Sequence, residues 1–165
     1  MLSGRRANIR SYIVAIVIPL AVGILSALLT KENMNIYAEV KTPPLAPPAF
    51  LFPVVWTILY ILMGISSAII WNRRENNLQA ARSGLMYYIA SLAFNFTWSI
   101  IFFNLRSFLV ALAWLLVLLY LIVCTVVEYK KVYQVAAYLQ IPYIVWVSFA
   151  GYLNAGIWWL NTVHV

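Results

Sequence analysis

The sequence predicts an all-α integral membrane protein: one domain over residues 1–165, built as a bundle of five transmembrane helices. The first observation is composition, because 65% of the residues are hydrophobic and 9% are charged, whereas soluble domains carry roughly 25% charged residues. The second is charge spacing, because the eleven basic and four acidic residues leave five uncharged runs. Each run reaches the roughly 20 residues that a helix needs to cross a bilayer. The third is the absence of the strict apolar–polar alternation that is typical of a membrane β-barrel.

The five helices are expected at roughly 12–30, 50–71, 83–105, 108–127 and 132–160. Arg5, Arg6 and Arg10 precede the first of them, as basic residues precede the apolar part of a signal peptide. The apolar stretch from Tyr12 to Leu29 is longer than the roughly 7–15 residues of that part, and no clean cleavage pattern follows it. The first run is therefore predicted to be a retained transmembrane helix.

The segment before the second helix is rich in proline. Five of the seven prolines lie between Pro43 and Pro53. A proline-rich loop loses little entropy on ordering and holds an extended path. We therefore expect the loop 31–49, called the lid from here on, to cap a cavity at the outer mouth of the bundle. Pro53 fits the first turn of the second helix, where its missing N–H costs nothing, while Pro142, inside the fifth helix, is expected to kink it.

Charge placement excludes several classes of function. None of the five expected spans contains Asp, Glu, Lys, Arg or His, and the sole histidine is His164. Proton relays and ion-coupled carriers need ionisable groups at depth, metal sites need clustered ligands, and a Ser–His–Asp triad needs a histidine. We therefore expect no metal site and no acid–base chemistry. The net charge of +7 resides at helix ends, where it sets topology, so no nucleic-acid partner is expected.

Aromatic residues at helical spacing suggest a ligand site. Three of the seven tryptophans lie away from the interfacial belts that tryptophan usually forms, and each shares a helix face with a small or polar neighbour. These faces are Trp56–Tyr60–Gly64, Tyr88–Asn95–Trp98–Phe102 and Pro142–Trp146–Ala150. Flat aromatic walls with a few donors suit a large planar apolar ligand. The same faces also fit ordinary helix–helix packing, and spacing alone does not decide between the two.

Three segments resemble the translocator protein family, also known as the TspO/MBR family, tryptophan-rich sensory protein or peripheral benzodiazepine receptor. The stretch KTPPLAPPAFLFPVVWTILYILMG is similar to its second-helix signature. The stretches NFTWSIIFF and IPYIVWVSFAGYLNAGIWWLN are similar to its third-helix and fifth-helix motifs. Order and spacing agree over essentially the whole chain.

The resemblance implies a homodimeric membrane receptor or sensor that needs no cofactor and binds tetrapyrroles, namely protoporphyrin and haem, beneath the first loop. Many members also bind cholesterol and benzodiazepine-type drugs. Carried over by motif, the ligand-binding residues are Tyr37, Trp56, Asn95, Trp98, Trp146 and Ala150. One alternative is light-dependent porphyrin degradation, in which Trp56 and Trp146 would be catalytic. Porphyrin transport is a second alternative, and a purely structural membrane protein is a third.

The sequence departs from the family pattern at two places. Leu45 and Phe50 stand where the family's first loop usually has tryptophan, which weakens the expectation of porphyrin stacking at the lid. Tyr152 has no Lys or Arg after it, whereas the cholesterol pattern, itself a weak motif, needs one. The second departure argues against sterol recognition.

The distribution of basic residues predicts the topology. Eight Lys and Arg residues fall in the N-terminal tail and in the loops 72–82 and 128–131, against three on the opposite side. By the positive-inside rule the N-terminus is cytoplasmic and the C-terminus and lid are outside. The short basic N-terminus favours a bacterial plasma membrane. A reporter fused after Val165 should be extracytoplasmic, and a cytoplasmic signal would overturn both the orientation and the outward-facing lid.

Overall fold

The computed structural model describes residues 8–163 and is all-helical over that range. Five of its helices are long and apolar enough to cross a membrane, which confirms the predicted fold class. The long helices are α1 (Ile9–Thr30), α3 (Leu51–Arg73), α4 (Leu78–Ser99), α5 (Phe108–Val132) and α7 (Ile141–Trp158). Short segments join or extend them: η1 (Lys31–Asn33), α2 (Ile36–Glu39), η2 (Arg74–Asn76), η3 (Ile100–Asn104), α6 (Gln134–Tyr138) and η4 (Trp159–Val163).

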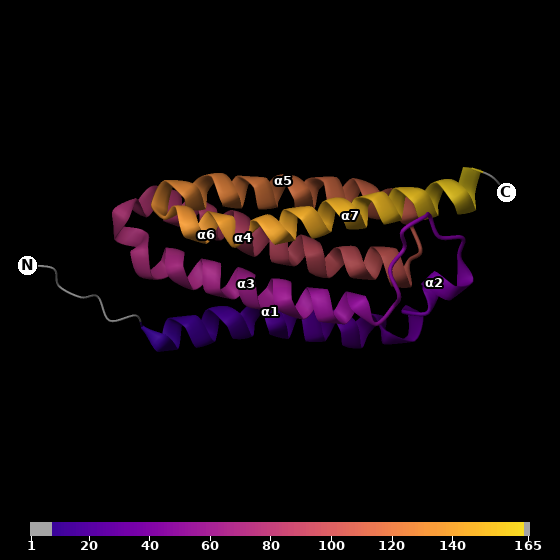
Figure 1. The fold of residues 1–165 in the computed structure, drawn as a ribbon, viewed down its shortest axis with the longest axis horizontal. Helices are drawn as coiled ribbons and strands as arrows, with labels where there is room; N and C mark the ends of the chain where they lie inside the picture. Colours follow the sequence, from indigo (N-terminus) through magenta and orange to yellow (C-terminus); the bar gives the residue numbers. More distant parts are fainter. Residues whose placement is uncertain (1–7, 164–165) are drawn as a thin grey trace, which may run out of the picture.

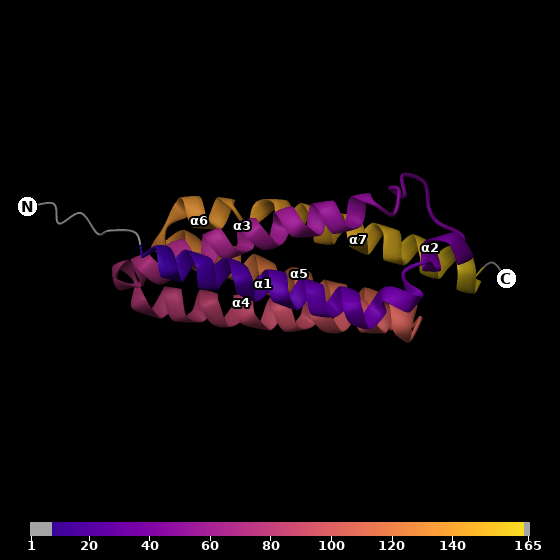
Figure 2. The same ribbon diagram turned by 90° about the horizontal axis from the view of Figure 1, so that it is seen from below.

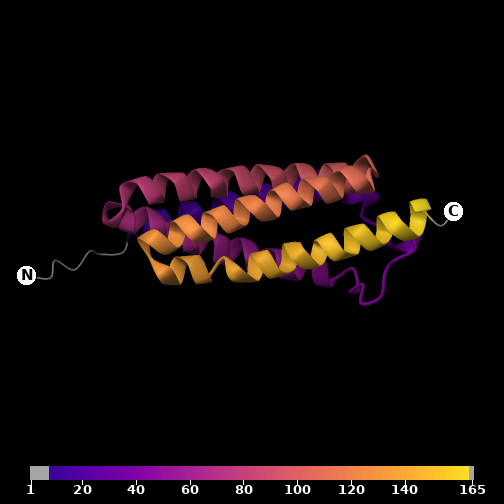
Figure 3. The same ribbon diagram turned by 90° about the horizontal axis from the view of Figure 1, so that it is seen from above.

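The helices form an elongated bundle. α1 begins at one end and α7 finishes at the other, beside α2 and the lid (Figure 1). α1 packs on α3, α4 on α5, and α5 on α7, while α6 packs on α3 and α5 (Figures 2 and 3). The buried core includes Met63, Ile70, Leu118, Ile122 and Ile157. Exposed leucine, isoleucine and valine cover the outer faces, as expected where lipid tails are the solvent.

Small residues let α1 approach the rest of the bundle closely. A Cβ atom on Gly64 would lie 2.5 Å from the Cα atom of Ile16 and 2.7 Å from the carbonyl oxygen of Ala15. A Cβ atom on Gly23 would lie 2.3 Å from the ring of Tyr60. Lipid tails are as apolar as leucine, so association inside a membrane depends on such close packing. Both glycines therefore pack within one bundle, and the expected homodimer stays a prediction.

The expectation for the fifth helix was wrong in one respect. The span is not one helix over 132–160, because a turn at Leu139 and Gln140 separates α6 from α7. Pro142 lies in the first turn of α7, where its missing N–H costs nothing, so it follows the break and does not kink a continuous helix. The buried Gln140 amide donates to the Ser66 hydroxyl at 3.1 Å, and that hydroxyl donates to the Ala136 carbonyl at 2.7 Å.

The other helix boundaries differ less from the prediction. α5 continues to Val132 instead of ending at 127. Lys130 and Lys131 occupy its last turn, where positive charge is favourable to the helix dipole. The lid is partly helical, because it contains η1 and α2, and α1 runs through Pro19 without ending there.

The contact between Gly64 and α1 predicts the effect of adding a side chain. Gly64→Leu should force α1 away from α3 and lower stability by about 1–3 kcal/mol, the usual cost of overpacking. Gly151 is the matched control, because a Cβ atom there meets nothing within 4 Å. Thermal unfolding in detergent should show a lower midpoint for Gly64→Leu than for Gly151→Leu. Equal midpoints would contradict the assigned packing.

Candidate ligand-binding cavity beneath the lid

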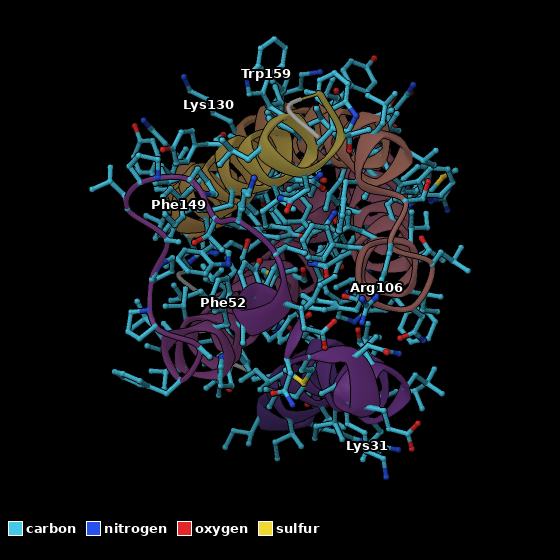
Figure 4. The ribbon with its side chains drawn as sticks, turned by 90° about the vertical axis from the view of Figure 1, so that its right-hand side faces the viewer. Lys31, Phe52, Arg106, Lys130, Phe149 and Trp159 are labelled. Carbon is cyan, nitrogen blue, oxygen red and sulfur yellow. The ribbon has the colours of Figure 1, made fainter. Side chains whose placement is uncertain are left out.

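A cavity of about 360 Å³ lies at the lid end of the bundle, between α1, α3, α4 and the lid. Figure 4 looks along the bundle from this end. The aromatic residues that line the cavity are Tyr37, Phe52, Trp56, Tyr60, Trp98 and Phe103. Among the described residues that line it there is no Asp, Glu, Lys, Arg or His. The cavity is therefore suited to an uncharged, largely apolar part of a ligand.

The aromatic side chains lie in near-parallel pairs. The rings of Trp56 and Tyr60 are 5.5 Å apart at 28°, since residues four apart share a helix face. Tyr37 of the lid and Phe52 of α3 are 5.1 Å apart at 29°. Such stacked pairs present flat surfaces, against which a planar ligand packs well. The exposed side chain of Met34 lines the same cavity, so the cavity reaches the surface of the bundle.

Beneath the aromatic walls lies a buried polar network. The Tyr60 hydroxyl donates to Asn95 Oδ1 at 3.4 Å, and Asn95 Nδ2 donates to the Tyr143 hydroxyl at 2.9 Å. These bonds connect α3, α4 and α7. An amide oxygen accepts two hydrogen bonds, so Asn95, which lines the cavity, can still accept one from a ligand N–H.

A second set of polar bonds fixes Trp98. Its indole N–H donates to Asn154 Oδ1 at 3.4 Å. Asn154 Nδ2 in turn donates to the carbonyl oxygen of Phe108 at 2.7 Å. The ring of Trp98 stacks on Phe102 at 5.3 Å. Its orientation is therefore set by contacts with α7 and η3, and α5 in turn holds Asn154 in place.

The lid is fastened to the C-terminal end of the chain. Asn161 Oδ1 accepts from the Lys41 backbone N–H at 2.9 Å, and Asn161 Nδ2 donates to the Lys41 carbonyl at 2.8 Å. The Tyr152 hydroxyl donates to the Pro44 carbonyl at 2.8 Å. These bonds hold the proline-rich part of the lid against α7 and η4.

Pro43 and α2 of the lid also contact the rest of the bundle. Pro43 is buried, and a Cβ atom added to Gly156 of α7 would lie 2.6 Å from its ring. On the other side, Arg106 forms an ion pair with Glu39 of α2 at 2.8 Å. Both of these side chains are about half exposed, and an exposed pair contributes little to stability. We infer that close packing and the Asn161 clamp hold the lid.

Leu45 and Phe50 do not face the cavity. Leu45 is 82% exposed and Phe50 70% exposed, and neither is among the lining residues. Leu45 has a φ of 67°, a left-handed conformation that is unusual for a non-glycine residue. The absence of tryptophan at these two positions therefore leaves the walls of this cavity unaffected.

The structure brings together four of the six expected ligand-binding residues: Tyr37, Trp56, Asn95 and Trp98 all line this cavity. Trp146 and Ala150 do not. Trp146 packs edge-on against Phe52, with ring centres 5.8 Å apart, so it lies behind a lining residue. Trp146 and Trp56 therefore do not face one another across this cavity, and Trp56 packs edge-on against Tyr143 at 6.1 Å.

Sequence reasoning missed several parts of the lining, among them Phe52 and the wall provided by α1. Phe52 lies one helical turn before Trp56, and this spacing of four residues could have identified it. The wall provided by α1 was also missed, although its small residues recur at helical spacing: Gly23, Ser26, Ala27 and Thr30. A ligand contact of Trp146 or Ala150 stays a prediction.

Comparison with known proteins gives consistent matches. Residues 15–160 match the sequence model of the TspO/MBR family. The chain is 37% identical to the tryptophan-rich protein TspO of Chlorobaculum tepidum, over 86% of this chain and 90% of that protein. It is 34% identical to the protein of the same name from Archaeoglobus fulgidus, over 93% and 99% of the two chains. It is also 34% identical to the translocator protein of Bos taurus, over 86% and 85%.

The clamp between Asn161 and Lys41 predicts how the lid can be released. Asn161→Ala removes the two hydrogen bonds to the lid, each worth about 1 kcal/mol, so amide exchange in residues 31–42 should accelerate roughly fivefold to thirtyfold. Thr162→Ala is the control, because Thr162 is the exposed neighbour of the clamp residue. Hydrogen-exchange mass spectrometry measures the difference, and unchanged protection in Asn161→Ala would show that the clamp does not hold the lid.

Proposed function

Because this chain belongs to the TspO/MBR family of integral membrane proteins, we propose that it is a membrane receptor that binds tetrapyrroles such as protoporphyrin and haem beneath its lid. The observation that supports this most directly is the uncharged cavity walled by stacked aromatic pairs. A receptor of this kind needs no cofactor of its own, since the tetrapyrrole is the ligand.

The affinity would come mainly from stacking and from apolar burial. Each aromatic contact adds about 1 kcal/mol beyond the burial of surface area, and Trp56, Trp98 and Tyr37 offer such contacts from three different segments. Asn95 lines the cavity, and its amide oxygen would accept from a pyrrole N–H of a metal-free porphyrin. Drug-sized ligands occupy pockets of roughly 300–1,000 Å³. A macrocycle would therefore fill this cavity and extend past Met34, with its charged propionates in water.

Light-dependent porphyrin breakdown is the second candidate. It is supported by the position of Trp56, whose oxidisable indole lines the cavity and would lie against a bound porphyrin. Trp146 is one ring further away, behind Phe52. We also propose that the protein is a homodimer, on the basis of the family resemblance. The short basic N-terminus supports a location in a bacterial plasma membrane.

Two alanines on α1 give a direct test. Both are exposed, but Ala27 lines the cavity and Ala21 does not. Purified protein in lipid nanodiscs is titrated with protoporphyrin in the dark, and binding is followed by absorbance. Ala27→Phe should weaken binding at least tenfold, because the new ring takes the place of the ligand. Ala21→Phe should bind as the parent does, and equal affinities for the two variants would place the site elsewhere.

The same titration under light separates the candidate activities. Trp56→Phe keeps an aromatic ring, so it should weaken binding only about threefold to tenfold. If the parent bleaches porphyrin and Trp56→Phe does not, the degradative activity is supported. Stable spectra in light support a receptor, and porphyrin that appears inside sealed vesicles supports transport. Trp146→Phe, behind the cavity wall, should change the dark affinity less than Trp56→Phe.

A further inference from the structure

A second cavity, of about 410 Å³, lies at the opposite end of the bundle. It is bounded by α1, α3 and α4, and Figure 2 shows α1 and α4 side by side along this part of the bundle. Arg10 lines it at the start of α1, and Ser67 and Tyr88 line it further in. We propose that this cavity binds an anionic glycerophospholipid from the surrounding bilayer. The phosphate would lie at Arg10, and a glycerol ester carbonyl would lie at Tyr88.

Tyr88, which lines this cavity, carries a polar group that a ligand could satisfy. Its side chain is 5% exposed, and within the described chain its hydroxyl is buried with no hydrogen-bond partner. A buried polar group without a partner is costly in hydrocarbon. The neighbouring Ser67 hydroxyl already shares a hydrogen bond of 3.0 Å with the Tyr129 hydroxyl. An acceptor that enters the cavity would satisfy Tyr88, and an ester carbonyl is an acceptor that a phospholipid carries a few ångströms below its phosphate.

The rest of the wall suits an acyl chain. Val14 and Ile18 of α1 are each 50% exposed and Ile89 of α4 is 63% exposed, and all three line the cavity. The cavity is therefore open sideways between α1 and α4, on faces that the bilayer covers. One acyl chain can lie between these two helices while the headgroup stays at the end of the bundle.

Charge favours an anionic headgroup at this end. The basic residues that the structure places at the same ends of the helices are Arg10, Arg73, Arg74, Arg82, Lys130 and Lys131. The acidic ones are Glu75 and Glu128, and Glu128 is already paired with Lys131. Basic residues near a membrane surface attract anionic lipid by about 1 kcal/mol each. The described residues that line the cavity beneath the lid, by contrast, include no basic one, so the two cavities differ in ligand chemistry.

The test is a lipid titration of the full chain in detergent, followed by native mass spectrometry. Phosphatidylglycerol should bind at least fivefold more tightly than phosphatidylcholine. Tyr88→Phe removes the neutral hydrogen bond to the ester carbonyl, and Arg10→Gln removes the charge-assisted hydrogen bond to the phosphate. Each should weaken phosphatidylglycerol binding about threefold to tenfold. Tyr120→Phe and Lys31→Gln are the controls, because neither residue lines the cavity and Lys31 lies at the lid end of the bundle, and both should bind as the parent does.

A blocking variant gives a second measurement. Val14→Trp should abolish the tight phosphatidylglycerol site, whereas Val17→Trp, which lies outside the cavity at a similar exposure of 54%, should not. Both variants should keep the parent's unfolding midpoint and protoporphyrin affinity, so this result is independent of the proposed receptor function. Unchanged phosphatidylglycerol binding in both Val14→Trp and Tyr88→Phe would overturn the proposal, as would equal affinity for the two lipids.

Discussion

Inside a bilayer no water is present to satisfy a polar group, so each buried N–H, C=O and hydroxyl depends on a partner within the protein. Most of this bundle meets the requirement through continuous helices. Several serine and threonine hydroxyls within the helices donate to the carbonyl of the preceding turn, as Thr30 does to Ser26 and Thr125 does to Leu121. Two kinds of place need hydrogen bonds from elsewhere in the bundle. One is where a helix is interrupted, and the other is where a polar side chain points inward.

The break between α6 and α7 and the floor of the lid cavity both follow from this constraint. At the break, the Ser66 hydroxyl donates to the Ala136 carbonyl, which a continuous helix would have bonded to a backbone N–H, and the Gln140 amide donates to that hydroxyl. At the cavity floor, Asn95 joins Tyr60 to Tyr143. In both places a polar side chain links helices that are distant in the sequence. The described residues that line the cavity above the floor can then remain free of charged groups, which suits a planar apolar ligand.

The spans could be predicted from the sequence because charged residues are costly within a helix that crosses hydrocarbon. The charged residues of this chain therefore lie before or between the predicted spans and mark their boundaries. Trp56, Asn95 and Trp98 could be assigned to the cavity because spacing by three or four places such residues on one helix face, whereas Tyr37 of the lid was expected from the family resemblance alone. The orientation of Trp146 could not be predicted, since spacing defines a face but not which neighbour that face meets. Pro142 was ambiguous for a similar reason: proline suits a first turn and also kinks a helix, and here the contact of Gln140 with Ser66 marks where the new helix begins.

Tyr88 shows a further limit of periodicity. It shares a face with Asn95, but seven residues of helix separate them by roughly 10 Å along the axis. Asn95 lines the cavity beneath the lid, while Tyr88 lines the cavity at the other end. One stripe of a helix can therefore serve two sites at different depths in the membrane, and depth is not encoded in the spacing.

The clamp on the lid has a consequence for biosynthesis. Lys41 and Asn161 are 120 residues apart, so a ribosome has synthesised four further spans after the first before the second half of the clamp exists. The lid precedes four of the five spans, and until the last of them is inserted its proline-rich part has nothing to fasten to. The closed cavity is therefore the final product of assembly, and a nascent or prematurely terminated chain would present an open one.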